Sequence, residues 1–148
     1  MSHEYFTKAV ELYNSLIALR QNPATPISYV TTLIDTAEQA RLAVLEDRQN
    51  GDAYIILATV LSMEADQYPD GNPGNTRYIG RSAAVIYHWK SNKTKLKSDP
   101  SFANFGERVY AHISECVNDA FATQGGVRYF ESLYKQYFND ALAAPDSK

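Results

Sequence analysis

About six segments of this chain repeat apolar residues every three or four positions, which is the spacing of one face of an α-helix. The segment over residues 4–20 carries Tyr5, Ala9, Leu12, Leu16 and Leu19, and the next segment carries Ile27, Val30, Ile34, Ala37 and Val44. No two alternating segments are joined by a hairpin turn. The pattern predicts an all-α fold of about six helices, packed as a compact bundle or as stacked helical hairpins.

Proline, glycine and short polar residues predict where these helices begin and end. Thr25-Pro26 is typical of a helix start, because threonine caps free N–H groups and proline has no N–H to lose at that position. We expect Asn50-Gly51 to end this second helix in a left-handed turn and Asp52 to cap the third helix. The other expected boundaries are a helix start at Asp99-Pro100, a break at 124–126, a last helix over 127–143 and a disordered tail over 145–148.

Residues 53–67 admit two interpretations. The run from Tyr54 to Leu61 is apolar apart from Thr59, and its β-branched residues are also typical of a buried strand. The segment continues beyond the usual length of a strand, which favours a helix that is buried on most of its sides.

The size and composition suit one domain over residues 1–144, since the chain has 148 residues and 45% of them are hydrophobic. The single cysteine, Cys116, excludes an internal disulfide and fits a reducing compartment. The polar start of the chain lacks the features of a secretory signal, and no apolar run approaches the roughly 18 residues of a membrane helix. We therefore expect a cytoplasmic protein with no membrane association and no cofactor.

The charges are distributed unevenly along the chain. Residues 1–76 hold four Lys or Arg against ten Asp or Glu, whereas residues 77–148 hold ten against seven. The stretch over residues 77–97 contains no acidic residue and holds Arg77, Arg81, Lys90, Lys93, Lys95 and Lys97. Such asymmetry indicates an interaction with a negatively charged partner, or self-association in which the acidic half of one copy meets the basic half of another.

Two of these arginines are expected on one face of a helix. Residues 68–76 are rich in proline, glycine and asparagine and predict a loop, with Thr76 capping a helix over 77–91. At about 100° per residue, one narrow exposed stripe of that helix would carry Arg77, Arg81, Ala84 and His88. The helix start and the preceding loop residues Gly74, Asn75 and Thr76 would offer backbone N–H groups to an anion.

Aromatic residues flank this stripe. Eleven of the eighteen aromatic residues are tyrosines, and Tyr78, Tyr87 and Trp89 lie beside the basic positions. Exposed rings at such a place would stack on nucleic-acid bases or anchor a protein partner. Helical spacing also predicts that Trp89 can face the core.

The residues favour a small interaction module that binds an acidic macromolecule through a basic and aromatic surface around residues 77–97. The alternative is a binding protein for a phosphorylated or anionic small molecule, or for single-stranded nucleic acid, that uses the loop over 70–76 with Arg77 and Arg81.

An enzyme is the third hypothesis. His112 and Cys116 are four positions apart on a predicted helix, which allows contact between them, and His88 is a further candidate. Two potential ligands do not make a tetrahedral metal site, and no complete catalytic motif is present. We therefore expect a binding protein rather than an enzyme.

Overall fold

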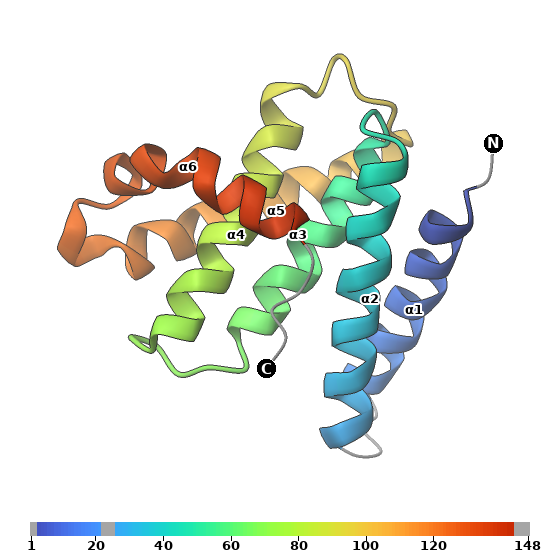
Figure 1. Ribbon diagram of the computed structural model, residues 1–148, viewed down its shortest axis with the longest axis horizontal. Coiled ribbons are helices and arrows are strands. Elements are labelled where there is room, and N and C mark those ends of the chain that lie inside the picture. The colour runs from blue at the N-terminus through green and yellow to red at the C-terminus, as the bar shows by residue number, and fades with distance from the viewer. Residues whose placement is uncertain (1–2, 22–25, 144–148) are drawn as a thin grey trace.

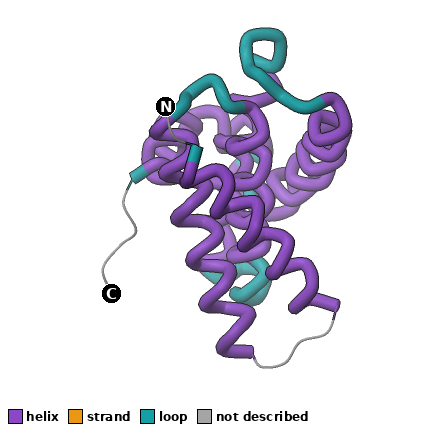
Figure 2. The backbone as a smooth tube through the Cα atoms, turned by 90° about the vertical axis from the view of Figure 1, so that its right-hand side faces the viewer, coloured by secondary structure: helices purple, strands orange, loops and turns teal. Residues whose placement is uncertain are grey.

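The computed structural model describes residues 3–21 and 26–143. Six α-helices follow one another: α1 (Glu4–Gln21), α2 (Pro26–Glu46), α3 (Gly51–Ala65), α4 (Pro73–Ser91), α5 (Pro100–Ala120) and α6 (Val127–Leu142), with a 3₁₀ turn at Ala122–Gln124. The described residues contain no strand (Figure 2), only one isolated bridge between Asn50 and Lys97. The all-α prediction is confirmed. Thr25, the side chain of Ile27 and residues 145–148 lie outside the described part.

The helices pack as a compact bundle of sequential hairpins. In Figure 1, α1 and α2 run antiparallel at one side of the molecule, α3 lies between this pair and α4, and α6 crosses α4. Helix α5 packs against α3, α4 and α6. Consecutive helices are neighbours because their connections are short, which is the usual outcome in helical bundles.

Helix α3 is the centre of the fold. It packs against α1, α2, α4 and α5, and eleven of its fifteen residues are buried. The apolar run from Tyr54 to Leu61 therefore forms a helix surrounded by other helices, rather than a strand. A hydroxyl group fixes the contact with α4, since Ser82 Oγ donates a hydrogen bond of 2.6 Å to the carbonyl oxygen of Ala58.

The boundary between α2 and α3 differs from the prediction. Asn50 is the N-cap of α3, and its side chain accepts a hydrogen bond of 3.2 Å from Ala53 N. Gly51 is not left-handed but is the first residue of α3, where the segment over 96–98 passes close to it. The Gly51 N–H donates to Lys97 O at 2.9 Å, so this junction is fixed by a distant part of the chain that local turn preferences do not include.

Helix α4 begins earlier than predicted, because Asn72 rather than Thr76 caps it. The Asn72 side chain accepts a hydrogen bond of 2.8 Å from Gly74 N. Gly74, Asn75 and Thr76 therefore belong to the first turn of the helix and not to an open loop. The Asn75 side chain is buried and donates to Ala65 O at 2.9 Å. Asn75 thus ties the start of α4 to the end of α3 instead of facing solvent.

Other predicted boundaries are confirmed. Asp99 caps α5 by accepting from Ser101 N at 3.0 Å, and Pro100 is the first helical residue. The break between α5 and α6 contains Gly125 and Gly126, both with positive φ, a backbone conformation that other residues rarely adopt.

We expect Gly106→Ala to destabilise the fold by about 1–3 kcal/mol, because the added methyl group would overpack the core. An ideal Cβ at Gly106 would lie 2.8 Å from the Trp89 indole and 2.8 Å from Ile55 Cδ1. Urea denaturation measures this change, and Asn104→Ala at an exposed position of the same helix is the control. A Gly106→Ala protein as stable as the Asn104→Ala protein would contradict this packing.

Candidate functional site

A cavity of about 410 Å³ lies between α2, α3, α4 and α6. One part of its lining is apolar and consists of Val30, Leu33, Ile34, Ala37, Leu57, Leu61, Ala141 and Ala143. The other part is polar and includes Glu38, Arg41, Glu64, Gln67, Tyr68, Arg77, Tyr78, Arg81 and Asp140. This volume falls within the range of roughly 300–1,000 Å³ that is typical of small-molecule sites.

The apolar lining is partly open to solvent. Ile34 is 52% exposed and Val30 is 37% exposed, although helical periodicity placed both on the predicted core face of the second segment. Tyr68, which also lines the cavity, is 38% exposed. Large apolar side chains that are exposed next to a concave surface indicate a binding site more strongly than isolated ones do.

The two predicted arginines both line this cavity from α4. Arg81 Nε is buried and has no hydrogen-bond partner among the described residues. The Arg81 guanidinium lies over the Tyr78 ring, 5.5 Å from its centroid. Within the described ranges, neither Arg77 nor Arg81 has a carboxylate within ion-pair distance. A buried donor without an acceptor carries a desolvation cost, which an anionic ligand would remove.

Arg41, on α2, differs from these two arginines. Its Nε and Nη2 atoms donate to both oxygens of Glu38, at 2.9 and 2.7 Å, and its Nη1 donates to Leu142 O at 3.2 Å. The charge of Arg41 is therefore already matched inside the protein, and the contact with Leu142 links α2 to the end of α6.

Glu64 brings a carboxyl group into the same cavity from α3. Burial raises the pKa of Glu64 to about 7, against the opposing effects of a hydrogen bond from Tyr78 and the positive charge of Arg81. Near neutral pH, the carboxyl group is therefore only partly ionised. Because Glu64 is often uncharged, it compensates the charge of Arg81 only in part.

Tyr68 and Tyr78 form one wall of the cavity. Their rings stack with centroids 5.9 Å apart. The Tyr68 ring lies against the backbone of Gly74, where even a Cβ atom would collide with it at 2.6 Å. The glycine in the first turn of α4 thus serves to position Tyr68, rather than to bind an anion through an open loop.

The predicted exposed stripe over Arg77, Arg81, Ala84 and His88 is wrong for its last two members. Ala84 is fully buried, and the His88 ring lies between Tyr54 and Phe138, at centroid distances of 5.0 and 4.6 Å. Burial, together with the charge of Arg48, lowers the pKa of His88, so the imidazole is neutral at pH 7. The reason is that α6 crosses α4 and covers this part of the helix (Figure 1).

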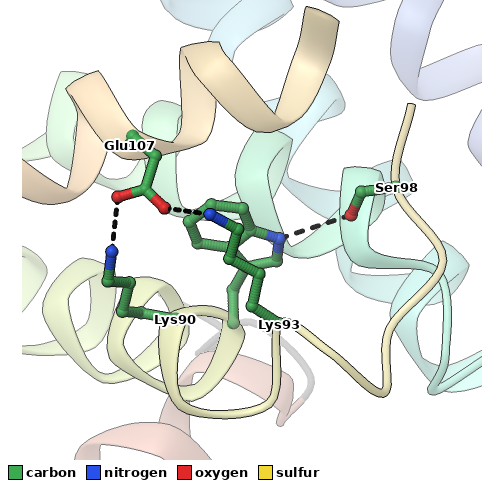
Figure 3. A network of polar contacts seen from close by, with 5 residues as sticks. Lys90, Lys93, Ser98 and Glu107 are labelled. Carbon is green, nitrogen blue, oxygen red and sulfur yellow. Dashed lines mark hydrogen bonds and ion pairs between the residues drawn. The ribbon is translucent and has the colours of Figure 1, made fainter. Parts of the chain in front are cut away.

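Two of the four predicted lysines form ion pairs with a glutamate on α5. Figure 3 shows that Lys90 and Lys93 both reach Glu107, and each Nζ lies 2.5 Å from one of its carboxylate oxygens. These two hydrogen bonds lower the pKa of Glu107. Lys95 and Lys97 are exposed in the segment that follows α4. Residues 77–97 contain no acidic residue, but in the folded protein a carboxylate from α5 contacts two of their lysines.

Of the three flanking aromatic residues, Trp89 belongs to the core and Tyr87 is packed against it. Trp89 is 0% exposed, and its Nε1 donates to Ser98 Oγ at 3.4 Å. Tyr87 is half-buried, packs at 5.3 Å against Phe130 and shares a hydrogen bond of 3.2 Å with Ser114. The interpretation of Trp89 as an exposed stacking ring is wrong, and the alternative that it faces the core is confirmed. Tyr78 is the flanking ring that lines the cavity.

The candidate catalytic pair lies outside the cavity. Cys116 Sγ and His112 Nε2 are 3.7 Å apart, so the predicted contact across one helical turn is present. Burial and four surrounding carboxylates raise the pKa of the Cys116 thiol, which disfavours the nucleophilic thiolate. In residues 3–21 and 26–143, no group of three His, Cys, Asp or Glu side chains is arranged to hold a metal ion.

Sequence reasoning missed most of the cavity lining. Glu64 is the one carboxyl group that follows the apolar run of α3, whose other carboxyl group, Asp52, lies in the first turn, and that contrast could have marked Glu64 as unusual. Glu38, Arg41 and Asp140 gave no such signal, because charged residues on amphipathic helices are common. Their convergence depends on how α2 and α6 are placed against α3 and α4.

A comparison of the chain with protein-family models, with curated proteins and with solved structures found no match. Among the described helices, none combines the length and the apolar character needed to cross a bilayer.

We expect Glu64→Gln to stabilise the protein at high pH. Because the pKa of Glu64 is raised from 4.5 to about 7 by folding, its contribution to stability is fully present below about pH 4.5 and is lost as the pH rises from there through about 7. The variant should therefore be more stable than the wild type by about 1–2 kcal/mol at pH 8, and similar to it near pH 4. Urea denaturation at both pH values tests this. Equal stability of the two proteins at high pH would show that the carboxyl group is not strained by burial.

Proposed function

We propose that this protein binds a small amphipathic molecule in the cavity between α2, α3, α4 and α6. The apolar part of the ligand would pack against side chains such as Ile34 and Leu61, and its anionic group would lie against Arg77 and Arg81. The observation that carries the proposal is the buried Arg81 Nε without a partner, in a cavity that apolar side chains also line.

Three properties of the cavity support a ligand of this chemistry. Guanidinium groups match the geometry of carboxylates and can bind them with two parallel hydrogen bonds. Arg77 and Arg81 are one turn apart on α4, so both can approach the same group. The exposed part of Ile34 offers apolar surface that a ligand would remove from water, which contributes about 25 cal/mol per Å² buried.

We favour this small ligand over the acidic macromolecule predicted from the lysines. Glu107 pairs with both Lys90 and Lys93 and so cancels one of their two positive charges, and Trp89 is not available as an anchoring ring. Lys95 and Lys97 are exposed, and binding of an acidic protein surface or a nucleic acid through them stays a prediction.

The proposal is tested with two probes that share an apolar tail, decanoate and decanol. Decanoate should raise the melting temperature of the wild-type protein more than decanol does, because the carboxylate adds contacts with the arginines. The double variant Arg77→Gln with Arg81→Gln should bind decanoate at least about tenfold more weakly, since charge-assisted hydrogen bonds contribute about 1.5–3 kcal/mol each. Calorimetric titration measures both affinities.

A charge-matched control is Arg20→Gln with Arg128→Gln, because both side chains are exposed and lie outside the cavity. This control should bind decanoate as the wild type does. Absence of decanoate binding to the wild type, or equal weakening in both double variants, would contradict the proposal.

A further inference from the structure

Glu64 lies among the side chains that would hold the anion. It lines the cavity from α3, accepts a hydrogen bond from the Tyr78 hydroxyl and interacts with the charge of Arg81. An ionised carboxylate at this position would compete with an anionic ligand for Arg81 and would repel it.

The charged and titratable groups that share the cavity with Glu64 come from every element around it. They are Glu38 and Arg41 on α2, Arg77, Tyr78 and Arg81 on α4, Asp140 on α6, and Tyr68 in the connection between α3 and α4. Arg41 and Glu38 are joined by two hydrogen bonds, so their formal charges cancel. The remaining formal charges are those of Arg77 and Arg81 against those of Glu64 and Asp140.

The net charge of these four groups depends on whether Glu64 is protonated. With Glu64 ionised, the two arginines are matched by two carboxylates and the cavity has no excess positive charge. With Glu64 protonated, one positive charge is left over, which one monoanion would neutralise. A neutral Glu64 also has an O–H group that can donate to an anionic oxygen, while Tyr78 continues to donate to its other oxygen.

We infer that the cavity binds a monoanionic amphiphile with Glu64 protonated, so that binding takes up a proton wherever the carboxylate of Glu64 is still ionised. This inference rests on the proposed function. The proton comes from solvent and forms an O–H bond on Glu64, and no bond of the ligand is broken. Ligand binding and protonation then favour each other by the same factor, as linkage requires.

Because protonation of Glu64 favours binding, the affinity for the anionic ligand should fall as the pH rises. Protonation of Glu64 in the free protein is half complete at about pH 7, and a bound anion would raise its pKa further. Decanoate is fully ionised throughout this range, so its own titration does not contribute. The affinity for decanoate should therefore fall by about five- to tenfold between about pH 6 and about pH 8.

The test is calorimetric titration of the full chain with decanoate at about pH 7, in two buffers with different enthalpies of protonation. The difference between the apparent enthalpies gives the number of protons taken up, which should be about one half, because roughly half of the Glu64 carboxyl groups are already protonated. Glu64→Gln should abolish proton uptake and bind decanoate with an affinity that does not change with pH. Glu46→Gln, an exposed control on α2, should keep both properties of the wild type.

A second measurement on the wild-type protein does not depend on a variant. The ¹³C signal of the Glu64 carboxyl carbon, followed by NMR against pH, should report a higher pKa when decanoate is present than when it is absent.

The results of these experiments distinguish a failure of the proposed function from a failure of the inference about Glu64. Absence of decanoate binding at every pH would overturn the proposed function and the inference together. Binding without proton uptake, or proton uptake that persists in Glu64→Gln, would overturn the inference and leave the proposed function standing. A Glu64 carboxyl pKa that does not move when decanoate binds would also overturn the inference.

Discussion

The burial of α3 is the constraint on which the rest of the structure depends. Its apolar run must be covered on nearly every side, and α1, α2, α4 and α5 provide the cover. Glu64, near the end of this helix, is the exception: a carboxyl group carried into the interior by the helix that the fold encloses. Side chains from α2, α4 and α6 line the cavity together with Glu64.

Helix α6 covers part of α4 and so limits which basic residues of that helix can reach a ligand. Its Phe138 ring stacks on His88, and its Tyr137 ring packs closely on Gly80, so the central part of α4 is covered. Arg77 and Arg81 lie at the part of α4 that faces the cavity. Of the basic residues on α4, Arg77 and Arg81 are therefore the two that lie beside the apolar side chains of the cavity.

The fold could largely be predicted from the sequence, because the helices are encoded locally by apolar spacing and by Asp99 and Pro100 at the start of α5. The boundary at Gly51 could not, since a hydrogen bond to the distant Lys97 O fixes it. The start of α4 was predicted at Thr76, although Asn72 caps the helix locally and Pro73 is its first residue. For the site, local periodicity identified Arg77 and Arg81. It could not show that Glu107 meets two lysines from another helix, nor that Ile34 would face a cavity instead of the core.

The most direct measurement is the ¹⁵N–¹H signal of Arg81 Nε, assigned by its loss in Arg81→Lys and followed as decanoate is added. If the buried N–H group donates a hydrogen bond to the ligand's carboxylate, its ¹H signal shifts strongly downfield, and the shift saturates with the affinity measured by calorimetry. A signal that stays in place while decanoate binds would contradict the central claim that this unpartnered donor defines the site.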